Sequence, residues 1–144
     1  MKTRSTVLGV VVTILGVIGL IAAARPTAKT VKVQRYGMVI GVKPEKLDYY
    51  RKLHAHPWPA VNKMIEECHI RNYSIYLTQL DDGKWYLFSY FEYTGDDFDA
   101  DMAKMAADPV TQRWWKETKP CQIGLKNRKP GEWWKVMDEV YHLD

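Results

Sequence analysis

The amino-acid sequence predicts an α+β fold of the ferredoxin-like type, a split βαβ sandwich with one antiparallel sheet and helices on one of its faces. Two hydrophobic patterns carry this prediction. Apolar residues alternate with polar ones in some segments and recur every three or four residues in others. The patterns succeed each other in the order β-αα-β-β-αα-β. The 144 residues suit a single domain, and no internal repeat divides them.

The first strand and a pair of helices are expected in the first half of the chain. β-branched and apolar residues over 31–42 predict a strand. Pro44 is typical of a helix start, and this helix is expected to end near His54, before two prolines interrupt it. Apolar residues at helical spacing over 60–68 predict a second helix.

A hairpin and a second pair of helices follow. Alternation over 73–78 predicts a strand, the Asp-Asp-Gly sequence at 81–83 predicts a tight turn, and 85–93 predicts the antiparallel partner strand. The remaining elements are expected as helices over 97–107 and 110–117, a basic loop over 120–131 and a final strand over 133–143.

One face of this sheet would be left without a cover. Residues on both faces of the strands are apolar or aromatic, so the face away from the helices needs a partner. The association of two such sheets is the simplest cover for a chain of this size. The sequence therefore predicts a homodimer.

The N-terminus is expected to be a separate segment. Lys2 and Arg4 precede an almost wholly apolar run over 7–24 that ends in small residues, a pattern typical of a signal peptide cleaved after Ala24. A run of about 18 residues also suits a membrane anchor, so both interpretations stay open. Either one predicts an exported protein, periplasmic or held at a membrane by residues 7–24. The chain then divides into a signal peptide or anchor over 1–24, a linker and strand start over 25–33, and a domain over 34–144.

Charge and cysteine content exclude some classes of protein. The formal net charge is +4, but Lys2 and Arg4 belong to the N-terminal segment, and the remaining +2 is too small for a nucleic-acid-binding surface. Six Trp and nine Tyr favour a core with a ring-lined pocket. Cys68 and Cys121 cannot form a zinc site by themselves. In an oxidising compartment they could pair as a disulfide, and two separate buried thiols are the equal alternative.

His54 is the candidate for acid–base chemistry. Tyr50 lies four residues earlier on the same expected helix, so the two side chains share a face. Histidine titrates near neutral pH and suits a general acid or base. A helix-end histidine stabilised by the helix dipole fits the position equally well. His54 and His56 lack a third ligand at matching spacing, so no metal site is expected.

Two tryptophan pairs stand out. Trp114 and Trp115 are adjacent on an expected helix and point about 100° apart. We expect one of them to pack inward and the other to face a cleft or a partner. Indole rings that stack on the apolar faces of sugars are a common means of carbohydrate recognition, and simple core packing is the alternative. Trp133 and Trp134 would face opposite sides of the final strand.

Four motifs together resemble the L-rhamnose mutarotase family. They follow in the family's order, from about residue 34 to residue 144. The motifs are Tyr50-x3-His54-x3-Trp58-Pro59, Asn72-Tyr73-x-Ile75-Tyr76, Thr111-Gln112-Arg113-Trp114-Trp115 and Glu139-Val140-Tyr141-His142-Leu143.

The resemblance implies a fold, an activity and a set of site residues. The fold would be a dimeric α+β barrel. The protein would be a cofactor-independent isomerase that interconverts the α and β anomers of L-rhamnose or a related 6-deoxyhexose such as L-fucose. His54 would be the proton donor, Tyr50 and Tyr73 would contact the sugar, and Trp114 and Trp115 would line its site.

The expected chemistry is acid–base ring opening. One proton goes to the ring oxygen and one leaves the anomeric hydroxyl, and general acid–base help of this kind is worth roughly 10²–10⁴-fold in rate. We expect His54 to act on the ring oxygen, while the residue that acts as base is not identified. Two alternatives stay open: an exported sugar-binding module without catalysis, and a monooxygenase or haem-handling protein on the same fold.

Overall fold

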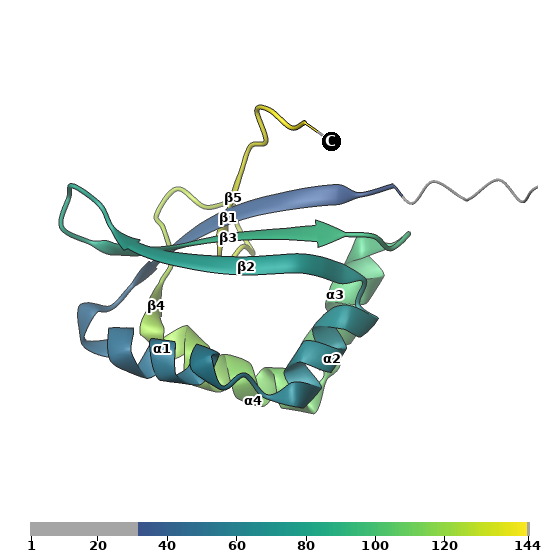
Figure 1. Ribbon diagram of the computed structural model, residues 1–144, viewed down its shortest axis with the longest axis horizontal. Coiled ribbons are helices and arrows are strands. Elements are labelled where there is room, and N and C mark those ends of the chain that lie inside the picture. The colour runs from purple at the N-terminus through teal and green to yellow at the C-terminus, as the bar shows by residue number, and fades with distance from the viewer. Residues whose placement is uncertain (1–31, 144) are drawn as a thin grey trace, which may run out of the picture.

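The computed structural model describes residues 32–143, which form an antiparallel sheet with four α-helices packed on one face (Figure 1). Two short 3₁₀ turns, η1 and η2, connect strands and helices. The elements in chain order are β1 (Gln34–Val42), η1 (Pro44–Lys46), α1 (Leu47–Ala55), α2 (Pro59–Glu67), β2 (Ile70–Gln79), β3 (Trp85–Tyr93), α3 (Phe98–Ala107), α4 (Pro109–Thr118), η2 (Lys119–Cys121), β4 (Gln122–Ile123) and β5 (Lys135–Met137).

The sheet has the topology that the sequence predicts. The strand order is β2-β3-β1-β4, and β5 also pairs with β1. Because β3 lies between β1 and β2 and is antiparallel to both, β1 and β2 run in the same direction with a helical pair between them. This arrangement is the split βαβ unit, and it confirms the ferredoxin-like α+β fold.

The strand register assigns alternate residues to the two faces of the sheet. Ile40 and Leu77 both lie opposite Leu87, and these side chains point toward the helices. Val39 and Tyr76 both lie opposite Phe88 and share the other face. The inner face therefore builds the core, and the outer face carries an aromatic strip of its own.

The core consists of two separate clusters. One gathers around Ile40 and Leu87 and includes Tyr50 of α1. The other gathers around Phe91 and Tyr93 and includes Met105 of α3. Both clusters lie between the sheet and the helices, so the layer is packed at two places along the strands.

The two cysteines belong to different clusters. Cys68 packs in the cluster of Phe91, and Cys121 packs in the cluster of Ile40. Both are buried free thiols, which resolves the open alternative in favour of two separate thiols. Burial is the main cause that raises the pKa of each thiol above its ordinary value.

The final strand is much shorter than expected. Only Lys135–Met137 pairs with β1, while residues 138–143 leave the sheet and Val140 is 94% exposed. The pairing of β4 with Gly41 and Val42 takes the β1 edge that would lie opposite Trp133, so β4 limits where β5 can begin. The expected loop over 120–131 accordingly contains the two residues of β4, which alternation cannot reveal.

The first helix was expected from Pro44, but residues 44–46 form η1 and α1 starts at Leu47, whereas the other three helices start within one residue of the prediction. The carboxylate of Asp97 accepts a hydrogen bond from the Ala100 backbone N–H at 3.0 Å, so Asp97 precedes α3 as its N-cap. Asp108 caps α4 in the same way, with the Thr111 N–H as donor at 2.6 Å. Pro59 and Pro109 occupy the first turns of their helices, where a backbone N–H would have no hydrogen-bond acceptor within the helix.

Replacement of the Asp97 cap should lower the stability of the domain. In Asp97→Ala the first turn of α3 loses its acceptor, and we expect the free energy of unfolding to fall by about 1 kcal/mol. Asp97→Asn keeps a side-chain acceptor and should lose much less. Urea unfolding followed by circular dichroism measures both. Equal losses in the two variants would contradict a capping role.

Candidate active site

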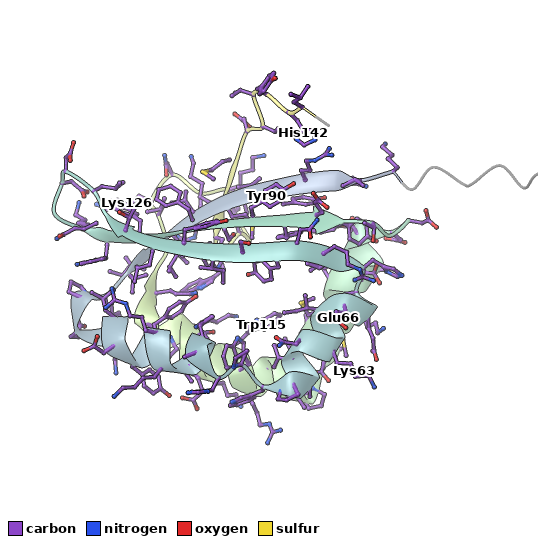
Figure 2. All side chains as sticks on the ribbon, in the orientation of Figure 1. Lys63, Glu66, Tyr90, Trp115, Lys126 and His142 are labelled. Atoms are coloured by element: carbon purple, nitrogen blue, oxygen red, sulfur yellow. The ribbon has the colours of Figure 1, made fainter. Side chains whose placement is uncertain are left out.

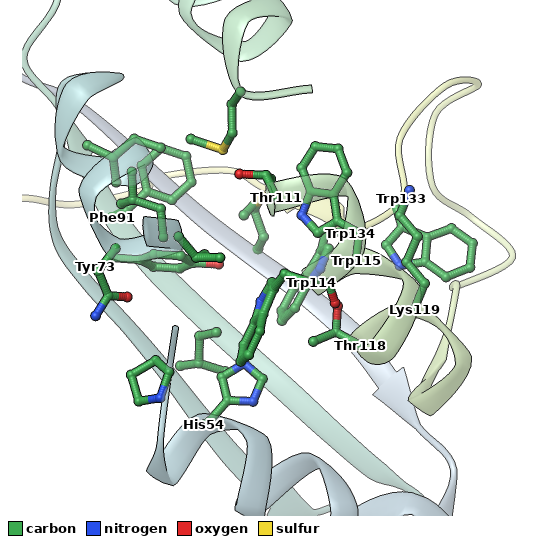
Figure 3. Close-up of a pocket in the computed structure, with 18 of the residues that line it drawn as sticks. His54, Tyr73, Phe91, Thr111, Trp114, Trp115, Thr118, Lys119, Trp133 and Trp134 are labelled. Carbon is green, nitrogen blue, oxygen red and sulfur yellow. The ribbon is translucent and has the colours of Figure 1, made fainter. Parts of the chain in front are cut away.

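A cavity of about 600 Å³ lies between the sheet and the helices. Its size is in the range of small-molecule sites. Side chains from both core clusters line it, among them Ile75 of the first and Phe91 of the second. Figure 3 shows this cavity with His54 at one side and the tryptophans around it. Tyr50, His54, Tyr73, Trp114 and Trp115, which the sequence singles out, all contribute to its wall.

Helix α1 supplies His54 and Tyr50 one turn apart. Nδ1 of His54 lies 2.9 Å from the backbone carbonyl oxygen of Tyr50, and the two rings stack with centroids 4.0 Å apart. Since a carbonyl oxygen only accepts, Nδ1 carries the proton in this hydrogen bond. Burial lowers the pKa of His54, opposed by the same hydrogen bond. The neutral imidazole therefore keeps a free lone pair on Nε2.

Both tryptophans of α4 line the cavity, which differs from the expectation of one core ring and one cleft ring. Trp114 is buried, and its ring meets His54 edge-on at a centroid distance of 5.2 Å. Trp58 contacts Trp114 from the other direction at 5.4 Å. Trp115 is partly buried, with the Lys119 ammonium 4.9 Å from its ring centroid. The indole of Trp114 thus holds the imidazole in place.

Tyr73 reaches the cavity from β2 because the strand is irregular beside it. Asn72 has a positive φ of 50°, and the register with β3 shifts between Arg71 and Ser74. The ring of Tyr73 meets Phe91 edge-on at 5.7 Å. Although 40% of the residue is exposed, its ring faces the cavity, and burial raises the pKa of the phenol to about 12.

The pKa of Tyr50 is raised as well. Burial is the main cause, and the negative charge that Tyr73 would carry when ionised adds to it. Both phenols consequently stay protonated at neutral pH. The cavity thus presents two O–H donors and one imidazole acceptor among aromatic rings.

Residues that the sequence did not assign to the site complete the wall. Gln122 of β4 is 7% exposed, and its Oε1 accepts a hydrogen bond from Nε1 of Trp133 at 2.6 Å. Trp134 lines the cavity beside Trp133, so these two rings do not lie on opposite faces of a strand. Arg128 donates to the backbone carbonyls of Leu125 and Glu132 and so ties together the loop that carries the tryptophans. No periodic pattern marks these residues.

Metal-ligating side chains are scattered. Over residues 32–143, no group of three or more His, Cys, Asp or Glu side chains is close enough to hold a metal ion. His56 is exposed and is absent from the wall of the cavity, although it lies two residues from His54.

Comparisons with known proteins agree on one family. The family model of L-rhamnose mutarotase matches residues 35–143. The chain belongs to the L-rhamnose mutarotase family. It is 30% identical over 112 residues to an L-rhamnose mutarotase of Oceanobacillus iheyensis, covering 78% of this chain and 100% of that protein. It is 31% identical over 112 residues to an L-rhamnose mutarotase of Phocaeicola vulgatus, with the same coverage of both chains.

Solved structures share the fold of this family member. The crystal structure of the L-rhamnose mutarotase FA22100 from Formosa agariphila superposes with a TM-score of 0.57 at 17% identity, covering 77% of this chain and 99% of that one. Tetracenomycin F2 cyclase from Streptomyces glaucescens, a type-II polyketide cyclase, gives 0.53 at 12% identity, covering 77% and 97%. At these identities the likenesses establish the fold alone, and the cyclase shows that the fold serves more than one chemistry.

The comparisons correct the prediction of an exported, periplasmic or membrane-anchored protein. The family match begins at residue 35, and the relative from Oceanobacillus iheyensis aligns over its whole length, which leaves no part of it to correspond to an export segment. Over residues 32–143 no helix is long and apolar enough to cross a membrane. Residues 1–24 lie outside the described residues, and the division of the chain at 24 and 34 stays a prediction. The comparisons also do not support the alternative that the protein is an exported sugar-binding module without catalysis.

His54 should titrate below the ordinary histidine pKa of 6.5, because burial disfavours the imidazolium form. Since the unfolded chain then binds more protons than the folded one, the contribution of His54 to stability should decrease as the pH falls below about 6.5. An NMR titration of the imidazole carbon-bound protons, assigned with His54→Asn, measures the midpoint. A midpoint at or above 6.5 would contradict the buried, neutral imidazole.

Proposed function

We propose that this protein is a sugar mutarotase, an isomerase that interconverts the α and β anomers of L-rhamnose or a close 6-deoxyhexose. Membership of the L-rhamnose mutarotase family supports this proposal. The observation that carries it is the neutral imidazole of His54, which has a free Nε2 within an aromatic cavity and two protonated phenols beside it.

The cavity suits a pyranose ring with a methyl group. The indoles of Trp114, Trp115 and Trp134 offer flat apolar surfaces to the C–H faces of a sugar. The phenols of Tyr50 and Tyr73 supply hydrogen-bond donors for its hydroxyl or ring oxygens. The many apolar side chains of the wall favour a sugar that lacks one hydroxyl.

The proposed reaction needs one acid–base residue. The Nε2 lone pair of His54 takes the proton of the anomeric hydroxyl, the bond between C1 and the ring oxygen breaks, and C1 becomes an aldehyde. The imidazolium then gives the proton to the ring oxygen, which is bonded to the same C1 and so lies within reach of the same nitrogen. Rotation of the aldehyde and the reverse steps give the other anomer.

The lowered pKa of His54 refines the role expected from the sequence. A neutral imidazole must accept a proton before it can act as the acid toward the ring oxygen. The same residue then serves in both roles. The reaction is an isomerisation without net gain or loss of atoms. The bond between C1 and the ring oxygen breaks and forms again, and no oxidant or reductant is needed.

We also propose that the protein is a homodimer joined through the outer face of the sheet. Tyr76 is 63% exposed there, beside Phe88 in the strand register. Tyr141 and Leu143 of the C-terminal segment are each 76% exposed. Figure 2 shows Tyr90 and His142 on this side, opposite Trp115 and Glu66. An aromatic surface of this kind favours a protein partner.

Loss of His54 should remove most of the catalysis. We expect His54→Asn to lower kcat/KM for anomer exchange of L-rhamnose by roughly 10²–10⁴-fold. NMR saturation transfer between the two anomeric protons measures the exchange, with L-fucose as a second sugar. His56→Asn is the matched control, since His56 is exposed and outside the cavity. Full activity in His54→Asn would refute the mechanism.

A charge on the outer face should dissociate the dimer. In Phe88→Lys the ammonium would have to be buried between two sheets, so sedimentation at micromolar concentration should change from dimer to monomer. Lys52→Ala on α1 is the control on the opposite side and should stay dimeric. A wild-type protein that sediments as a monomer would overturn this proposal.

A further inference from the structure

Lys119 places a positive charge at the rim of the cavity. It lines the cavity and is exposed to solvent, and Trp133 beside it lines the cavity while 38% exposed. The Lys119 ammonium lies 4.9 Å from the ring centroid of Trp115 and 5.9 Å from that of Trp133. In Figure 3, the rings of Trp114 and Trp115 lie between this pair and His54. The charge is therefore held by two indoles, apart from the imidazole.

The ammonium is available to a ligand. Among residues 32–143, no carboxylate pairs with Lys119, and its ammonium forms no hydrogen bond. The carboxylate of Glu117, two residues earlier, accepts a hydrogen bond from the Tyr49 hydroxyl instead. That of Glu132 accepts one from the Lys129 backbone N–H at 2.9 Å. Indole faces attract a cation without satisfying its three N–H donors, so these donors can bind an oxygen-bearing anion.

The rest of the cavity wall is neutral. Within the part of the chain that the structure describes, Lys119 alone among the lining residues carries a formal charge, since no Asp, Glu or Arg is included and His54 is neutral. Arg128 lies outside the wall, with its guanidinium 6.0 Å from the ring centroid of Trp133, and adds a second positive charge near the rim. A cleft with apolar walls and charge of one sign attracts ligands of the opposite sign. The cavity therefore favours an anion.

The cavity also has room for more than one small sugar. A 6-deoxyhexose has eleven non-hydrogen atoms, and at about 30 Å³ for each, the volume of a water molecule in the liquid, it fills roughly 330 Å³. The cavity of about 600 Å³ leaves space for a substituent. In a pyranose whose C1 lies at His54, O4 is across the ring. A group on O4 therefore extends away from the imidazole.

We propose that Lys119 is a specificity-determining residue, and that the preferred substrate is a reducing 6-deoxyhexose that carries an anionic group. The anomeric carbon lies at His54, and the Lys119 ammonium binds the anionic oxygens at the rim through charge-assisted hydrogen bonds. The anion is a carboxylate of a uronic acid linked to the sugar, or a sulfate ester on the sugar itself. The inference rests on the proposed function and narrows its substrate class.

Anomer exchange of two matched sugar pairs tests this proposal. The first pair is D-glucuronic acid linked to O4 of reducing L-rhamnose, and the neutral methyl ester of this disaccharide. The second is L-rhamnose 4-sulfate and L-rhamnose. In at least one pair, kcat/KM from NMR saturation transfer should be about fivefold higher for the anion, the value of one partly screened ion pair, and the preference should shrink at high salt. The pair that shows the preference identifies the source of the anion.

Variants of Lys119 separate recognition of charge from a structural role. Lys119→Met keeps a side chain of similar length against the indoles but removes the charge, so the preference for the anion should disappear. A purely structural role would lower kcat/KM for both sugars of a pair alike. Lys119→Arg keeps the charge and should keep the preference. Lys116→Met changes the net charge equally at an exposed position of α4 outside the cavity wall, and should also keep it.

Binding distinguishes failure of this proposal from failure of the proposed function. Tryptophan fluorescence measures Kd for all four sugars whether or not the protein accelerates exchange, and the anion should bind about fivefold more tightly than its neutral counterpart to the wild type alone, not to Lys119→Met. Weaker, equal or no binding of both anions to the wild type, or a preference that Lys119→Met keeps, would overturn the proposal. A binding preference without any anomer exchange would count against the proposed function only.

Discussion

The space between the sheet and the helices is the constraint on which the rest of the structure depends. The two layers are held together by one cluster around Ile40 and Leu87 and another around Phe91 and Tyr93, and the cavity is bordered by both. A gap in an apolar core forfeits packing energy. Large aromatic side chains line this gap and pack against one another, which offsets part of the lost packing energy. The same contacts therefore stabilise the fold and shape the candidate site.

Contact between rings also explains why the imidazole is held so firmly. His54 stacks on Tyr50 and touches the edge of Trp114, which in turn meets Trp58. Its Nδ1 is hydrogen-bonded within α1, which leaves Nε2 as the nitrogen for the proposed proton transfer. Helices α1 and α4 must therefore keep their relative position for the imidazole, the proposed acid–base group, to stay against Trp114 in the cavity wall, and the capped start of α4 stabilises that helix.

The parts of the fold that follow a local pattern could be predicted from the sequence. Strand β3 was expected over 85–93 and has those bounds, because alternation and the preceding Asp-Asp-Gly turn both act within a few residues. Strand β5 was overestimated because β4 already pairs with the part of β1 opposite its expected start, and because the chain leaves the sheet after Met137. In the same way, the helix face predicted that Tyr50 and His54 lie together, whereas the contact of Gln122 with Trp133 depends on the path of a loop and has no sequence pattern.

Each core cluster contains one buried thiol, so the opening of the two clusters can be measured separately. Cys68 lies in one cluster and Cys121 in the other, each enclosed and with a raised pKa, so neither reacts with a thiol reagent while its cluster stays closed. The labelling rate of each cysteine thus reports how often its own side of the cavity opens. Unequal rates would mean that one of the two clusters opens more often than the other.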